Sequence, residues 1–473
     1  MKQQYTFTSW ARELQLLLNS DIKRADITVL VVYYYKNHVR RLFMAYTPSK
    51  WQQDKNSVKS RCTKFGKKHA GFKRAYNSVL RFRRKNRFSK YCDLPIDDKL
   101  VIFESFMGRR YSDSPRAIYE YMLNCDDYND YRFIWSIRGS VIDDYQFLEN
   151  NDRTTVIQYG TENYYRTFAT AGYWISNSRI VNALVPRDGQ VYVQCWHGTP
   201  LKRLAYDIEV SGQNDLHDKD DLLKLYSIDA SKYTHMISPS AFCTEKFTSA
   251  FNLKALGKQD IFIEEGYPRN DFLNNFTADD VDRVRNALNI PSDKKIILYA
   301  PTWRDNQHVS GTGYVFENPI DFDKMRELFA DEYVVVFRPH YFIANEFDFA
   351  KYEGFVFDAA LYPEINDLYI IADVLITDYS SVFFDYSILR RPILFYMYDL
   401  EQYQDTIRGF YISLDDLPGP IVVKEDDLFD KIRCMDEWSS SEEYRKKYEV
   451  FSDRFTYLDD GKASERVVKR IFG

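Results

Sequence analysis

Polar side chains follow three apolar runs of this 473-residue chain, at the points where the runs end. Each run is typical of a buried β-strand, and the three ends carry His197 with Gly198, Arg338 with Pro339 and His340, and Ser380 with Ser381. The carboxyl ends of parallel strands gather at one edge of an open α/β sheet, where ligands bind. Two histidines, an arginine and paired serines at such edges predict chemistry on a phosphorylated substrate.

His197 is the first candidate for a proton acceptor. The unperturbed pKa of histidine is about 6.5, so its neutral ring can take a proton at cellular pH. Gly198 leaves the backbone open to a ligand, and Pro200 can begin a helix; the alternative is a histidine that caps a buried loop. Cys195 lies two residues earlier, but a thiol inside a strand behaves as a small apolar group, so we expect no cysteine nucleophile.

The other strand ends supply groups that bind phosphate. The guanidinium of Arg338 offers a rigid, permanently charged fork, and His340 beside it could stabilise charge on a leaving phosphate. Ser381 and Asp385 share one face of a helix predicted over 382–389. The serine could hold a phosphate there while the aspartate accepts a ribose hydroxyl, and plain helix capping by the serine is the alternative.

The motif Ala300-Pro301-Thr302-Trp303-Arg304 follows a further strand and adds a hydroxyl and an arginine. The chain has no GxGxxG or GxxxxGK[ST] pattern, so dinucleotide and P-loop interpretations lack their main support. Its six cysteines are scattered without a CxxC pair, and no His or Cys pair has the spacing of metal ligands. We therefore predict no disulfide framework, no metal site and a reducing compartment.

Two series of alternating strands and helices must position these groups. The first is predicted to hold strands 100–104, 131–136 and 173–176, a strand that ends at His197, and helices 114–121 and 164–171. The second is predicted to hold strands 295–299, 333–337, 374–377 and 392–396, and residues 230–247 and 250–257 look helical. This alternation predicts an α/β protein with parallel sheets, in two Rossmann-like domains that span 97–285 and 286–473.

Residues 1–96 are predicted to be a basic N-terminal extension. It shows no signal-peptide pattern, and its apolar run 27–35 is too short to span a bilayer. Residues 50–90 hold fifteen Lys and Arg against one acid, Asp54, a net charge of +14 in a chain whose total is −5. Such a segment, with aromatic residues at intervals, favours either an anionic membrane surface or a solvated helical linker. Nucleic acid is disfavoured because the α/β part is acidic overall.

Several motifs occur together and in order over roughly residues 97–473. They are Phe103-Glu104-Ser105-Phe106, Tyr111-Ser112-Asp113-Ser114-Pro115, Trp196-His197-Gly198-Thr199-Pro200-Leu201-Lys202, Gly266-Tyr267-Pro268-Arg269-Asn270-Asp271, Tyr299-Ala300-Pro301-Thr302-Trp303-Arg304, Arg338-Pro339-His340, Thr377-Asp378-Tyr379-Ser380-Ser381 with Asp385, Arg408-Gly409-Phe410-Tyr411, and Asp460-Gly461-Lys462-Ala463-Ser464-Glu465-Arg466. On these motifs the chain resembles the CDP-glycerol glycerophosphotransferase family, the teichoic-acid primases and polymerases of bacteria.

The resemblance implies a glycosyltransferase-B type fold, with the active site in a cleft between an acceptor domain (97–285) and a CDP-donor domain (286–473). It implies transfer of glycerol phosphate from CDP-glycerol to a lipid-linked acceptor with release of CMP, and no cofactor. By family analogy His197 is the base and His340 assists at the donor pyrophosphate. The residues implied to hold the donor are Arg269, Thr302, Arg338, Ser380, Ser381 and Asp385, with Trp196, Gly198, Thr199, Pro301 and Pro339 beside them.

Other functions stay open at this point. CDP-ribitol could replace CDP-glycerol as donor, because related enzymes share these motifs, and the choice between primase and polymerase is equally open. A catalytically silent membrane scaffold would use only residues 50–90, although both histidines are present. We expect the protein at the cytoplasmic face of the cell membrane, bound peripherally to its anionic surface through that segment.

Overall fold

The structure is a computed structural model that describes residues 70–208, 219–302, 308–309, 313–314, 318–339, 347–401 and 409–473. Its chain divides into two compact units, residues 1–93 with 182–184, and residues 94–181 with 185–473. In the first unit the described part includes helix α5 (Ala70–Ser89), whose residues 81–87 are all exposed. The predicted module 1–48 and most of the basic segment 50–90 lie outside the described residues.

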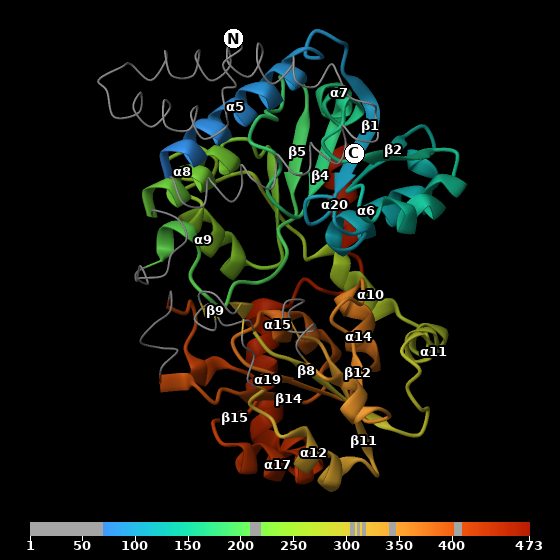
Figure 1. The fold of residues 1–473 in the computed structure, drawn as a ribbon, viewed down its shortest axis with the longest axis vertical. Helices are drawn as coiled ribbons and strands as arrows, with labels where there is room; N and C mark the ends of the chain where they lie inside the picture. Colours follow the sequence, from blue (N-terminus) through green and yellow to red (C-terminus); the bar gives the residue numbers. More distant parts are fainter. Residues whose placement is uncertain are drawn as a thin grey trace, which may run out of the picture. The chain divides into compact units, whose positions relative to one another are not determined.

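The second unit contains a seven-stranded parallel sheet with the strand order β3-β2-β1-β4-β5-β6-β7 (Figure 1). Its strands are β1 (Asp97–Glu104), β2 (Arg132–Ile137), β3 (Thr154–Gln158), β4 (Ala171–Ser176), β5 (Val191–Gln194), β6 (His235–Ser238) and β7 (Phe262–Glu264). Its helices are α6 (Asp113–Asn124), α7 (Glu162–Thr170), α8 (Lys219–Ala230) and α9 (Ala241–Ala250). The direction of the strand order reverses between β1 and β4, which is the position where doubly wound sheets bind ligands.

A six-stranded parallel sheet follows in the same unit, with the order β12-β11-β8-β13-β14-β15. Its strands are β8 (Lys295–Ala300), β11 (Tyr333–Phe337), β12 (Val356–Asp358), β13 (Val374–Thr377), β14 (Ile393–Tyr396) and β15 (Ile421–Val422), and a small hairpin joins β9 (His308–Val309) to β10 (Gly313–Tyr314). The helices are α10 (Asp271–Asn275), α11 (Ala278–Ala287), α12 (Phe322–Phe329), α14 (Ile365–Ile371), α15 (Val382–Tyr386), α17 (Glu425–Arg433), α18 (Met435–Ser439) and α19 (Glu442–Phe455). This order also reverses once, between β8 and β13, so both sheets are Rossmann-like.

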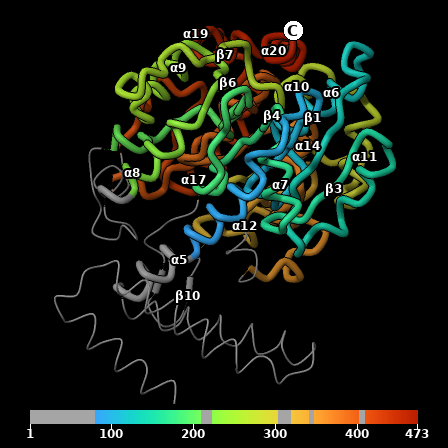
Figure 2. The backbone as a smooth tube through the Cα atoms, turned by 90° about the horizontal axis from the view of Figure 1, so that it is seen from above, coloured from blue at the N-terminus to red at the C-terminus, as the bar shows by residue number. Residues whose placement is uncertain are grey.

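The last helix, α20 (Ala463–Phe472), returns to the first sheet. Its buried Val467 and Val468 belong to the same apolar core as Val101 and Phe133 of β1 and β2, and both views place α20 beside α6 (Figure 1 and Figure 2). Asp271 holds the first turn of α20, because its carboxylate accepts the N–H groups of Ala463 and Ser464, each at 2.7 Å. The C-terminus therefore helps to build the core of the first sheet.

The structure confirms the predicted strands of both series and corrects three details. The strand predicted to end at His197 ends at Gln194, because Trp196 has a positive φ of 53° that a strand does not accommodate. Residues 230–247 are not one helix, since β6 lies between α8 and α9, and residues 251–257 form turns. A short apolar run can be a buried strand or part of a helix, and periodicity alone does not distinguish them.

The predicted helix 382–389 is α15 followed by a 3-10 turn, η8 (Ser387–Leu389). Two parallel α/β sheets confirm the predicted fold class at that level, while the division at residues 96 and 285 stays a prediction. Within the described part of the chain, no helix is both long enough and apolar enough to cross a membrane.

Candidate active site

The first half of the site lies where the order of the seven-stranded sheet reverses. The loop after β1 carries three consecutive residues with positive φ, namely Phe106 at 47°, Met107 at 58° and Gly108 at 75°. The residues after β4 hold this loop, because the Phe106 N–H donates to Oδ1 of Asn177 at 2.8 Å and the Met107 N–H to Oγ of Ser178 at 3.0 Å. Non-glycine residues with positive φ are costly and cluster at functional sites.

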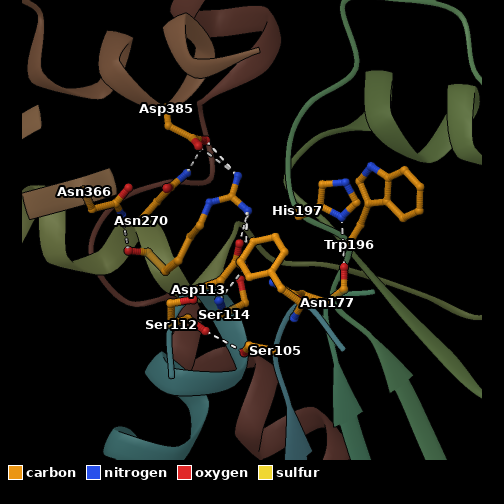
Figure 3. Close-up of polar contacts among 12 residues, drawn as sticks. Ser105, Ser112, Asp113, Ser114, Asn177, Trp196, His197, Asn270, Asn366 and Asp385 are labelled. Atoms are coloured by element: carbon orange, nitrogen blue, oxygen red, sulfur yellow. Dashed lines mark hydrogen bonds and ion pairs between the residues drawn. The ribbon is translucent and has the colours of Figure 1, made fainter. Parts of the chain in front are cut away.

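His197 lies next to this loop with a defined tautomer (Figure 3). Its Nδ1 is 2.9 Å from the backbone oxygen of Asn177. A carbonyl oxygen can only accept, so Nδ1 carries the proton and Nε2 of the neutral ring keeps its lone pair. The ring of Trp196 stacks on the imidazole with 4.5 Å between centroids. The arrangement leaves one nitrogen of a fixed ring ready to accept a proton.

The electrostatic surroundings of His197 keep the ring neutral. The side chain is exposed, yet the protein atoms around it lower its pKa from 6.5 by desolvation, and the nearby Arg269 acts in the same direction. The hydrogen bond to Asn177 and the charge of Asp113 oppose this shift without reversing it. A neutral imidazole at cellular pH is the form that a general base requires.

The second half of the site lies where the order of the six-stranded sheet reverses, after β8 and β13. Asp378 joins the two strand ends, since its Oδ1 accepts the N–H of Thr302 at 2.8 Å, the hydroxyl of Thr302, and the N–H of Tyr379 at 2.6 Å. Ser381 precedes α15, and its side chain makes no capping hydrogen bond to that helix. The Ser381 hydroxyl therefore does not cap α15, which was the alternative to phosphate binding.

The two halves come together at Gly198 and Ser381. A Cβ atom placed on Gly198 would lie 3.1 Å from Oγ of Ser381, so the backbone after His197 approaches this serine closely. The loop is also tied down further along, because the Arg203 N–H donates to the Gly409 carbonyl at 3.0 Å and the Tyr411 N–H to the Leu201 carbonyl at 2.9 Å. Residues predicted from separate strand ends thus meet in space.

Arg269 is buried between the carboxylates of Asp113 and Asp385, and Figure 3 labels these two aspartates. Its Nη2 lies 2.9 Å from Oδ2 and 3.1 Å from Oδ1 of Asp385, and its Nη1 lies 3.4 Å from both carboxylate oxygens of Asp113. The exposed fractions of the side chains are 3% for Arg269, 8% for Asp113 and 10% for Asp385. Burial acts to lower the pKa of Arg269, but the two carboxylates more than offset it, and the pKa is raised.

The side-chain amides of Asn366 and Asn270 and the carboxyl group of Asp459 lie next to this ion cluster. The Asn366 side chain donates to the Arg269 carbonyl at 2.7 Å, and the Asn270 side chain bridges Oδ1 of Asp385 at 3.1 Å and Oδ1 of Asp459 at 3.3 Å. Burial raises the pKa of Asp459 to about 8, with a contribution from the negative charge of Asp385. Asp459 therefore holds a proton at neutral pH more readily than an ordinary aspartic acid.

The remaining predicted residues are placed as follows. Arg338 follows β11 and donates from Nη1 to the carbonyls of Ala359 and Tyr362. Thr199 is buried and accepts a weak hydrogen bond from the Cys243 thiol at 3.6 Å. Cys195 is completely buried and burial raises its pKa, as expected for an inert thiol. Pro301 and Ser380 are half-buried, Pro339 is buried, and His340, Trp303, Arg304 and Arg408 lie outside the described residues.

Sequence reasoning did not select Asn177 or Asp459, and it quoted Asp113 only within a motif and gave it no role. Asn177 directly follows the predicted strand 173–176, so the rule that selected His197 could also have selected it. Asp113 and Asp459 carry no local signal, since their partner Arg269 and neighbour Asn270 are far away in the chain. Among the described His, Cys, Asp and Glu side chains, no three are grouped as they would need to be to hold a metal ion.

Comparisons with known proteins identify the family of the chain. The family model described as CDP-Glycerol:Poly(glycerophosphate) glycerophosphotransferase matches residues 87–473. A teichoic acid poly(glycerol phosphate) polymerase from Staphylococcus epidermidis is 40% identical over 408 residues, which are 83% of this chain and 53% of that protein. A teichoic acid glycerol-phosphate transferase from Staphylococcus aureus is 36% identical over 379 residues, which are 79% of this chain and 92% of that protein.

The solved structure of the wall teichoic acid polymerase TagF matches with a TM-score of 0.73 and 38% sequence identity, over 85% of this chain and 96% of that one. The chain spans about half the length of the Staphylococcus epidermidis polymerase and nearly all of the Staphylococcus aureus transferase.

Proposed function

The chain belongs to the CDP-glycerol:poly(glycerophosphate) glycerophosphotransferase family, and on this premise we propose that it transfers glycerol phosphate from CDP-glycerol to a lipid-linked teichoic-acid or capsular acceptor. The acceptor is a polyol phosphate or a glycan that ends in a hydroxyl. The products are the extended acceptor and CMP. The observation that carries the proposal is the hydrogen bond that fixes the tautomer of His197 beside the residues after β13.

In the proposed reaction, Nε2 of His197 accepts the proton of the acceptor hydroxyl. The hydroxyl oxygen forms a bond to the phosphorus of the glycerol phosphate group. The bond between that phosphorus and the bridging oxygen of the diphosphate breaks, and CMP leaves with the electron pair. The structure supports the first step because the Asn177 carbonyl holds the proton on Nδ1 and leaves Nε2 free of hydrogen.

On the donor side, we propose that His340 and Arg338 stabilise the charge that develops on the leaving CMP. Thr302, Ser380 and Ser381 would hold the nucleotide and its phosphates. Support comes from the position of Thr302, Arg338 and the two serines after the carboxyl ends of β8, β11 and β13, around the reversal of strand order. The proposal needs no metal and no cofactor, since the histidines and the arginine supply the proton acceptor and the positive charge.

Arg269 and Asp385 were predicted to hold the donor, and Trp196, Gly198, Thr199, Pro301 and Pro339 to lie beside it. The close approach of Gly198 to Ser381 supports a backbone role for the glycine. The ion pair between Arg269 and Asp385 occupies the groups that would contact a phosphate or a ribose. The proposal therefore requires that the bound donor either breaks this ion pair or adds its own contacts to the two side chains.

The experiment is to incubate the protein with a lipid-linked acceptor and either CDP-glycerol or CDP-ribitol and to measure CMP release. We expect release with CDP-glycerol that depends on the acceptor. Preferential release from CDP-ribitol would show that CDP-ribitol is the donor. No release of CMP from either nucleotide would favour a non-catalytic scaffold. His197→Gln should abolish release, whereas His235→Gln should not, although His235 is also a histidine whose pKa is lowered by desolvation. His235 lies on β6, two strands away from β4, and its Nδ1 is 3.1 Å from Oγ1 of Thr234.

We also propose that the protein works at the cytoplasmic face of the cell membrane, held to anionic lipid by residues 50–90. In the described end of this segment, five basic residues of α5 are exposed, namely Arg81, Arg83, Arg84, Lys85 and Arg87, and Phe82 among them is 63% exposed. Sedimentation with anionic vesicles should fall as salt rises. Deletion of 50–90 should reduce sedimentation and leave CDP-glycerol binding unchanged. Full sedimentation of the deletion variant would rule out this segment as the docking site.

A further inference from the structure

Two arginines from different α/β series converge on one loop of the second unit. Arg110 lies in the segment after β1, and its Nη1 donates to the carbonyls of Tyr362 at 3.3 Å and Pro363 at 3.0 Å. Arg338 lies directly after β11, and its Nη1 donates to the carbonyls of Ala359 and, at 2.7 Å, Tyr362. Both groups donate to the same oxygen, that of Tyr362, so the two guanidinium groups are neighbours.

Neither of these two charges forms an ion pair with a carboxylate of the described residues, in contrast to Arg269. Glu364 is close by, but its Oε2 accepts the N–H of Asp113 at 2.9 Å, and burial raises its pKa. Burial also lowers the pKa of Arg338 to about 10, and the charge of Arg110 is the next contribution. Two like charges are therefore held together in partly desolvated surroundings.

Most of the donors of these arginines make no hydrogen bond within the described part of the chain. A guanidinium has five N–H donors, and the hydrogen bonds of both side chains within the described structure use only Nη1. The Nε and Nη2 atoms of both residues are absent from the buried atoms that lack a partner, so they are accessible. An accessible pair of guanidinium forks matches the oxygen atoms of a phosphate group.

We infer that Arg110 is a second phosphate-binding residue, which acts together with Arg338 on the diphosphate of the nucleotide donor. The inference rests on the proposed function for the identity of the donor, but the anion chemistry of the site stands on the two arginines alone. A diphosphate between them would supply the negative charge that the described protein groups do not. It would also join residues from both α/β series in one ligand site.

The test compares Arg110→Gln with Arg109→Gln, which removes an exposed arginine next to it in the chain. Calorimetry with CDP-glycerol should show about a ten- to hundredfold weaker Kd for Arg110→Gln, the loss expected for a hydrogen-bonded charge, and no change for Arg109→Gln. Without ligand, the melting temperature of Arg110→Gln should equal or exceed that of wild type, because one of two like charges is gone. A Kd within twofold of wild type would overturn the inference.

A purely structural role for Arg110 predicts the opposite pattern, a lower melting temperature of the free protein with unchanged donor affinity. If Arg110→Gln folds poorly, Arg110→Lys keeps the charge while it loses the fork. A Kd more than twofold weaker than that of wild type supports the inference, because the fork is lost while the charge is kept, and a Kd within twofold of wild type overturns it. Inorganic pyrophosphate as a second probe separates the two proposals. If wild type binds it through Arg110 but releases no CMP from CDP-glycerol, only the proposed function fails.

Discussion

Replacing Arg269 with glutamine tests whether the ion cluster stabilises the free protein. The sequence predicts that this arginine holds donor phosphates, and a residue kept for a ligand adds little to the stability of the free protein. The structure instead pairs both terminal nitrogens with the buried carboxylates of Asp113 and Asp385. Arg269→Gln would leave two buried carboxylates without a cation in one cluster, and we expect a large loss of stability.

The magnitude follows from burial. Removing one partner of a buried ion pair costs about 3–5 kcal/mol, because the remaining charge is left desolvated and unpaired. Arg433 supplies the control, since its Nη1 lies 2.6 Å from Oδ1 of Asp430 and both side chains are exposed, at 51% and 69%. Arg433→Gln should cost about 0–1 kcal/mol, as exposed ion pairs do. The two variants thus compare a buried ion pair with an exposed one.

The assay is urea-induced unfolding of the ligand-free protein, followed by tryptophan fluorescence and by circular dichroism. We expect the free energy of unfolding of Arg269→Gln to fall below that of Arg433→Gln by several kcal/mol. A difference under about 1 kcal/mol, the range of exposed pairs, would refute the reasoning. Arg269 would then be available to the donor, as the sequence predicts.

Four further predictions concern titration and donor binding. The lowered pKa of His197 means that kcat/KM should fall only as the pH drops through a value below 6.5, and an acidic limb centred above 7 in the pH profile would contradict its role as base. Ser381→Ala should weaken CDP-glycerol affinity more than acceptor affinity without loss of stability, because the hydroxyl does not cap α15; equal losses for both substrates would argue against donor binding. Asp385→Ala should weaken donor affinity too, but with a lower melting temperature because it removes the partner of Arg269. The pKa of Asp459 is raised in the folded protein to about 8 by burial, so its contribution to stability is fully present below about 3.9, the pKa of an unfolded aspartate, and is lost as the pH rises from there through 8; the melting temperature of Asp459→Asn relative to wild type should therefore rise between pH 5.5 and pH 8.5, and the reverse trend would exclude a buried, protonated carboxyl.

The sequence by itself determined the strands that end at the site. Apolar runs such as 333–337 and 374–377 appear in the structure as strands with the same bounds, because burial on both faces of a parallel sheet demands apolar residues at every position. The polar residues that follow them had to lie at the carboxyl edge of a sheet, and His197 and Ser381 do. These predictions succeed because each rests on a property of a few consecutive residues.

Only the tertiary structure decided which groups those residues face. The cation of Arg269 is neutralised by residues 156 and 116 positions away, and Arg338 is brought beside Arg110 of the other α/β series. The proton of His197 is placed by the backbone oxygen of a residue in a different loop. Charge and hydrogen-bond partners are chosen by strand order and loop packing, which bring together residues with no periodic or sequential relation, so local patterns predict where a site lies but not how its charges are paired.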